Sequence, residues 1–60
     1  MIAAYKYIEG VRYTLYGTVT TEEVAIICTE RAREKGFKAR RFKEREAGED
    51  VYVIYVLRQG

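Results

Sequence analysis

Seven consecutive apolar residues, Val51 to Leu57, lie near the end of this 60-residue chain. Their β-branched and tyrosine side chains favour a strand, and both alternating faces of that strand are apolar. A strand of this kind is usually covered on both sides, so it is expected at the centre of a sheet. Because 60 residues build only one thin core, a single compact domain spanning residues 1–60 has to form around this strand.

Turn residues and changes of periodicity divide the rest of the sequence. Short stretches rich in Tyr, Val and Ile alternate with Gly-containing turns, as in two β-hairpins. The expected turns are Glu9-Gly10 and Ala47-Gly48-Glu49-Asp50. The predicted strands are Ile2 to Ile8, Val11 to Thr18, Phe37 to Glu46 and Val51 to Arg58.

One helix is predicted between the two hairpins. Thr20 and Glu23 have the spacing of a capping box, which indicates a helix from about Thr21 to Lys35. Gly36 is placed to end it in a left-handed conformation. The predicted fold is therefore α+β, ββαββ, with a four-stranded, mostly antiparallel sheet and one helix packed on one face. The strand order 1-2-4-3 puts the apolar strand at the centre and the basic third strand at an edge.

The first hairpin has two different faces if Ile8 pairs with Val11. The predicted core face consists of Ile2, Ala4, Lys6, Ile8, Val11, Tyr13 and Leu15. The helix is expected to pack on this face through Val24, Ile27, Cys28 and Ala32. Within that stripe the lone Cys28 is interpreted as a small core residue.

The last strand favours a homo-oligomer, most simply a dimer. One helix can cover only one face of the sheet, so another copy of the chain is the simplest cover for Val53 and Tyr55. Ile26, on the outer flank of the helix, supports the same expectation. A possible base-stacking or dimer face consists of Tyr5, Tyr7, Arg12, Tyr16, Val53 and Tyr55. The alternative is that tyrosines are simply good strand formers that need no ligand.

Charge is concentrated between Arg31 and Arg45. This segment holds eight basic and two acidic residues, a local charge of +6, whereas the rest of the chain has three basic and seven acidic residues, a charge of −4. Such a cationic surface favours a polyanionic partner. The alternative is a solvated edge strand whose charges prevent unwanted pairing. We call the eight basic residues the basic ridge: Arg31, Arg33, Lys35, Lys38, Arg40, Arg41, Lys43 and Arg45.

The residue types that are missing argue against catalysis. The chain has no His, Ser, Asn, Pro or Trp and one Cys, so most catalytic groupings, tetrahedral zinc sites and disulfides cannot be built. No cofactor or metal is expected, and no apolar run approaches the ~18 residues of a membrane helix. A cytoplasmic location and a composition typical of thermophiles are expected.

The function predicted from the sequence is therefore non-catalytic binding of nucleic acid, either RNA or DNA. The basic ridge would contact phosphates, and the protein would act as a homodimer. The alternative is a protein-interaction or assembly module, such as a viral or mobile-element accessory protein, whose oligomeric surface is the function.

Overall fold

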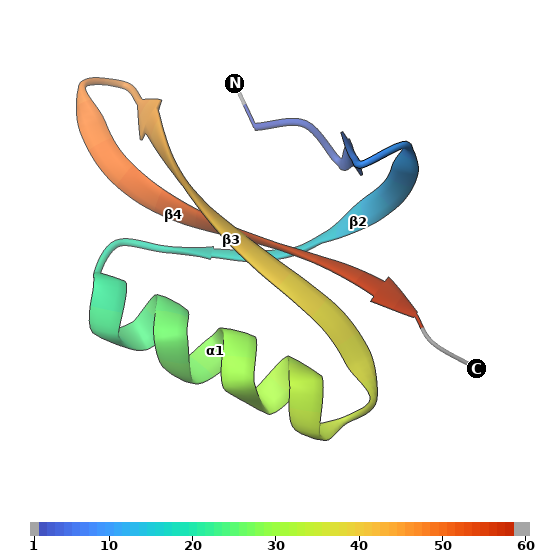
Figure 1. Cartoon of the computed structure of the whole chain (residues 1–60). Helices are drawn as coiled ribbons and strands as arrows, with labels where there is room; N and C mark the ends of the chain where they lie inside the picture. The colour runs from blue at the N-terminus through green and yellow to red at the C-terminus, as the bar shows by residue number, and fades with distance from the viewer. Residues whose placement is uncertain (1, 59–60) are drawn as a thin grey trace.

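Residues 2–58 are described by a computed structural model, so Met1, Gln59 and Gly60 of the predicted domain lie outside the described residues. Two hairpins flank one helix, in ββαββ order, and the strands form one antiparallel sheet in the order β1-β2-β4-β3 (Figure 1). This confirms the predicted α+β fold and strand order. The elements are β1 (Tyr5–Ile8), β2 (Val11–Val19), α1 (Glu22–Glu34), β3 (Phe37–Glu46) and β4 (Glu49–Arg58).

Both hairpins close with two-residue turns. Glu9 and Gly10 have φ angles of 52° and 79°, and Ala47 and Gly48 have φ angles of 50° and 81°. Two successive positive φ values are typical of type I′ turns, whose twist matches that of the strands. The first turn confirms the predicted pairing of Ile8 with Val11. The second turn is two residues shorter than predicted, so β4 begins earlier.

The residue that caps the start of the helix lies one position later than predicted. Thr21 has an extended backbone, and its hydroxyl accepts a hydrogen bond from the Val24 N–H at 3.4 Å. Thr21 therefore satisfies one of the unpaired N–H groups of the first turn, so the prediction of Thr20 as the cap is wrong. At the other end Gly36 has a φ of 94°, as predicted for a left-handed residue that ends the helix. Over residues 2–58, no helix is long and apolar enough to cross a membrane.

Small side chains hold α1 against the sheet. Ala25, Thr29 and Ala32 are buried, and Cys28 is partly buried beside them. The predicted stripe is wrong for Val24 and Ile27, which are 43% and 50% exposed. The helix is rotated so that its small residues face the sheet, because small side chains let the helix lie close to β3 and β4.

The N-terminal hairpin covers the face of the sheet opposite α1 (Figure 1). Its predicted apolar face is confirmed for Ile8, Tyr13 and Leu15, but these side chains pack on β4 rather than on the helix. A register shift in β2 between Leu15 and Gly17 interrupts the pairing with β4. Such bulges increase local twist, which is consistent with the curl of the hairpin over the sheet.

This curl removes the reason for which a second copy was predicted. Val53 and Tyr55 are 0% and 3% exposed within one chain, because Ile8, Tyr13 and their neighbours cover them. The premise that one chain cannot cover both faces of β4 is therefore wrong. The homodimer itself stays a prediction.

Candidate nucleic-acid interface

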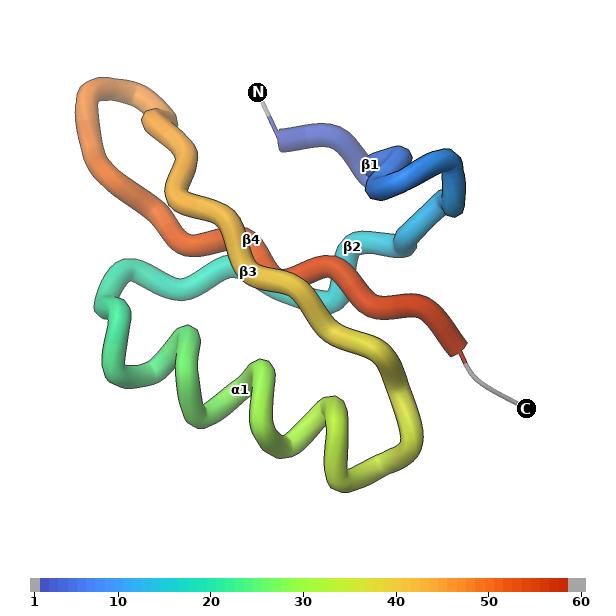
Figure 2. The backbone as a smooth tube through the Cα atoms, viewed as in Figure 1, coloured from blue at the N-terminus to red at the C-terminus, as the bar shows by residue number. Residues whose placement is uncertain are grey.

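The basic ridge follows the chain through a sharp reversal from α1 into β3 (Figure 2). The Lys35 N–H donates to the carbonyls of Arg31 and Ala32 at 3.2 and 3.1 Å, and the Gly36 N–H donates to Arg33 at 3.0 Å. These bonds complete the last turn of the helix. The strand β3 then begins at Phe37, directly after Gly36. The basic residues of the helix end and of the strand therefore form one continuous segment.

All eight side chains of the basic ridge are exposed, but they do not share one face. The register of β3 with β4 puts Lys38 and Arg40 on the face covered by the N-terminal hairpin. Arg41, Lys43 and Arg45 alternate onto the face that carries α1. Because β3 is an outer strand of the sheet, both groups remain accessible along its free edge.

Acidic residues neutralise part of this charge. Asp50 lies 3.6 Å from the Lys43 amine and 3.4 Å from the Arg45 guanidinium, and Glu9 lies 3.5 Å from Arg40. These contacts are long and exposed, and surface ion pairs contribute only about 0–1 kcal/mol. Over residues 2–58, four members of the ridge form neither an ion pair nor a side-chain hydrogen bond. They are Arg31, Lys35, Lys38 and Arg41.

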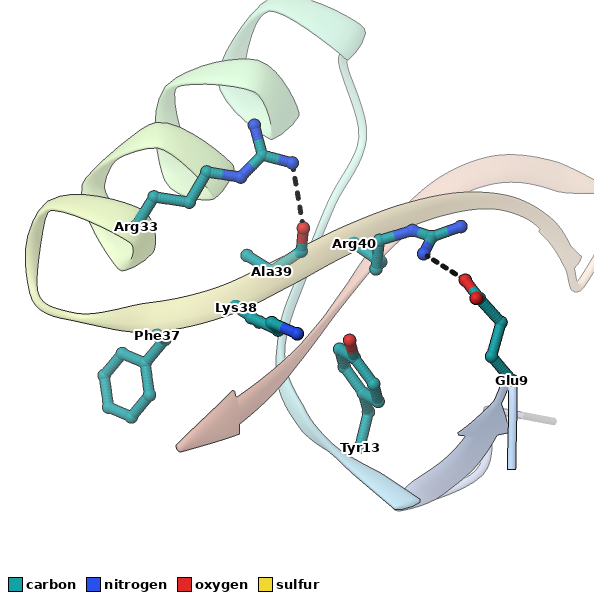
Figure 3. A pocket seen from close by; sticks show the side chains of 7 residues that line it. All are labelled: Glu9, Tyr13, Arg33, Phe37, Lys38, Ala39 and Arg40. Carbon is teal, nitrogen blue, oxygen red and sulfur yellow. Dashed lines mark hydrogen bonds and ion pairs between the residues drawn. The ribbon is translucent and has the colours of Figure 1, made fainter. Parts of the chain in front are cut away.

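Arg33 also has a structural contact. Its guanidinium donates to the Ala39 carbonyl of β3 at 2.9 Å (Figure 3). This bond joins the helix end to the first part of the edge strand. A guanidinium carries five N–H donors, so most of them remain available after this one bond.

An open hollow of about 380 Å³ lies beside the edge of β3 (Figure 3). Arg33 reaches it from α1, and Lys38 and Arg40 reach it from β3. Glu9 and Tyr13, from the N-terminal hairpin, line the other side, and Phe37 and Ala39 complete it. Three members of the basic ridge therefore converge on one concave place.

The residues predicted as a stacking or dimer face do not lie together. Val53 and Tyr55 belong to the buried cluster under the N-terminal hairpin, where they cannot contact a ligand. The Tyr55 hydroxyl donates to the Ala3 carbonyl at 2.8 Å. Burial raises the pKa of Tyr55 above its ordinary value of 10.0, and the Glu44 carboxylate adds to the rise. The hydrogen bond from Tyr55 to Ala3 therefore links the N-terminal segment to β4.

The other four residues of that set lie on the outer side of the N-terminal hairpin. Tyr5, Tyr7 and Tyr16 are exposed, and the Arg12 guanidinium lies 4.5 Å from the centre of the Tyr5 ring. Tyr16 instead approaches Phe37, with ring centres 6.2 Å apart. These rings are accessible, but Tyr5 and Arg12 already stack on each other.

Glu9 and Tyr13 were not predicted as site residues. Pairing of Ile8 with Val11 indicates correctly that Tyr13 faces inward. Its place beside β3 depends on the curl of the whole sheet, which no local sequence pattern specifies. The contact between Glu9 and Arg40 joins residues 31 positions apart for the same reason.

The described residues contain no metal site, and the chain shows no significant similarity to a known protein. Within residues 2–58, His, Cys, Asp and Glu side chains form no group of three that could hold a metal ion. Comparisons of the chain with protein-family models, curated proteins and solved structures find no significant match in any of the three.

Proposed function

We propose that the protein binds nucleic acid through the basic ridge. The observation that supports this most is the set of ridge cations that form neither an ion pair nor a side-chain hydrogen bond within residues 2–58: Arg31, Lys35, Lys38 and Arg41. A surface that serves only solubility usually carries interspersed positive and negative charges. This ridge instead keeps an excess of positive charge along an accessible strand edge, as expected of a surface that neutralises phosphates.

The proposed mechanism is phosphate neutralisation with release of counter-ions. If the four unpaired cations each replace one counter-ion, the logarithm of affinity falls with the logarithm of salt concentration at a slope of about −3 for single strands and −4 for duplexes. The contacts would be to the backbone and would carry little sequence information. The affinity should therefore vary little with base sequence.

A matched pair of double variants tests the role of the unpaired cations. Lys35→Gln with Arg41→Gln removes two cations that have no ion-pair partner among the described residues, and Lys43→Gln with Arg45→Gln removes two that share Asp50. Both lose the same charge. The first pair should lower the salt slope by about 1.5 and weaken binding more than the second pair, whose charge is already partly neutralised.

Binding is measured by titration of labelled single-stranded RNA, single-stranded DNA and duplex DNA at two salt concentrations. Binding that weakens with salt, and that Arg40→Glu with Arg41→Glu abolishes, supports the proposal. The absence of binding to all three at low salt would leave the ridge as a solvated edge that protects β3 from unwanted pairing.

Exposed apolar residues on α1 favour self-association as a second candidate function. Val24 and Ile27 are exposed and, three residues apart, lie on one side of α1, whereas Ile26 is exposed on another side. Apolar side chains grouped on a surface commonly mark an interface. A dimer through α1 would leave the β3 part of the basic ridge accessible. Light scattering at high protein concentration tests this: a dimer that Ile27→Glu converts to a monomer supports it, and a wild-type monomer rejects it.

A further inference from the structure

A tyrosine hydroxyl that has no hydrogen-bond partner among residues 2–58 lines the hollow beside β3. Tyr13 is only 6% exposed, yet its hydroxyl forms no hydrogen bond with any of residues 2–58. It points into the space that the Lys38 side chain also faces (Figure 3). Most of the Tyr13 side chain is buried, but its hydroxyl oxygen is open to the hollow, so it is free to donate a hydrogen bond to a ligand there.

The charges around this hydroxyl determine which ligand would suit it. Lys38 forms no ion pair within residues 2–58, and Arg33 keeps N–H donors beyond the one it gives to Ala39. Among the described residues, the ion-pair partner of Arg40 is Glu9, at 3.5 Å, and the Glu9 side chain is 84% exposed. An anion could therefore replace Glu9 at little cost. Three cations against one carboxylate leave the hollow with an excess of two positive charges.

We propose that the hollow binds the terminal phosphate of a nucleic-acid strand. This inference rests on the proposed function and assigns a specific part of the ligand to one part of the ridge. A terminal phosphate carries about −1.5 to −2 charges at pH 7 and several acceptor oxygens, which match two excess positive charges and the donors of Lys38, Arg33, Arg40 and Tyr13. A phosphate within the strand carries a single charge and would leave part of the excess unmatched.

The test compares one single-stranded oligonucleotide of about ten nucleotides in three forms: with a 5′-phosphate, with a 3′-phosphate, and with hydroxyls at both ends. The wild-type chain should bind one of the phosphorylated forms about tenfold more tightly than the unphosphorylated form. The two phosphorylated forms show which strand end is held.

Two variants of the hollow and two matched controls locate the effect. Tyr13→Phe and Lys38→Gln should each reduce the preference for the phosphorylated strand about three- to tenfold. Tyr7→Phe, on the outer side of the first hairpin, should leave the preference unchanged. Lys43→Gln should weaken binding of all three strands by the same factor, because Lys43 belongs to the ridge but does not line the hollow. Circular dichroism checks that each variant is folded.

The outcomes separate this inference from the proposed function. Equal affinity of the wild-type chain for all three strands overturns the terminal-phosphate site and leaves binding by the ridge intact. A preference that persists in both Tyr13→Phe and Lys38→Gln overturns the assignment to this hollow. Failure of all three strands to bind at low salt overturns both the site and the proposed function.

Discussion

Replacement of Val53 by Ala tests whether one chain alone buries the centre of its sheet. Val53 is 0% exposed and packs with Ile8, Tyr13 and Tyr55 in the cluster that the N-terminal hairpin covers. If this cluster forms within the monomer, the variant loses stability by the same amount at every protein concentration. If Val53 were instead buried by a second copy, the loss would depend on concentration.

The magnitude follows from the atoms removed. Val53→Ala takes away two buried carbons, which contribute about 0.8 kcal/mol each. The cavity that remains in a rigid core adds about 1 kcal/mol, so the total loss is about 2.5 kcal/mol. For a domain of this size, 1 kcal/mol lowers the melting temperature by about 4–8 °C, so Val53→Ala should lower it by about 10–20 °C.

The assay is thermal and chemical unfolding across about a hundredfold range of protein concentration. Val11→Ala is the matched control, because it removes the same two carbons from an exposed position of the N-terminal hairpin. It should cost less than about 1 kcal/mol. The reasoning is refuted if the two variants lose the same stability, or if the effect of Val53→Ala changes with protein concentration.

Two further predictions concern the backbone and pH. Gly36→Ala should cost about 1–2 kcal/mol in urea unfolding, because its φ of 94° is unfavourable for Ala. Gly17→Ala should instead stabilise by about 0.5 kcal/mol, since its φ is not positive and the added carbon meets no atom within 4 Å; equal effects of the two variants would contradict this explanation. Tyr55→Phe should cost about 1 kcal/mol at neutral pH through loss of the bond to Ala3. The raised pKa of Tyr55 favours the folded state fully below the unfolded value of 10.0, and this contribution is lost as pH rises above it. Unfolding measured from pH 8 to pH 11 should therefore show a steeper alkaline loss in the wild-type chain than in Tyr55→Phe, and parallel curves would reject this role.

Local chemistry was enough to predict the elements and their order. The two Gly-containing turns, Gly36 at the end of the helix and the apolar run in β4 each constrain a few neighbouring residues, so sequence patterns identify them. The turn Glu9-Gly10 also fixed the register of the first hairpin. What these patterns do not contain is the rotation of α1 or the curl of the sheet, which depend on packing between distant segments.

The wrong prediction of which α1 residues face the sheet shows this limit. Hydrophobic periodicity favoured Val24 and Ile27 as inward residues, because it ranks side chains by polarity and not by the space available. In the fold, Ala25 and Ala32 lie against the sheet, where larger side chains would hold the helix away from it. Thr29 tolerates burial because its hydroxyl donates to the Ala25 carbonyl at 2.7 Å. Close approach of the helix therefore decides which residues are buried.

The curl of the sheet links the stability of the fold to the candidate site. It brings the outer strands β1 and β3 near each other without pairing them, and side chains join them instead. The Lys6 amine lies 4.6 Å from the centre of the Phe42 ring, and Glu9, next to β1, contacts Arg40. Glu9 and Tyr13 also form one wall of the hollow, so the hollow exists only while the hairpin is folded over the sheet. A ligand held there would bind the folded state alone, and by mass action it would raise the melting temperature by an amount that grows with the logarithm of the ligand concentration divided by its Kd.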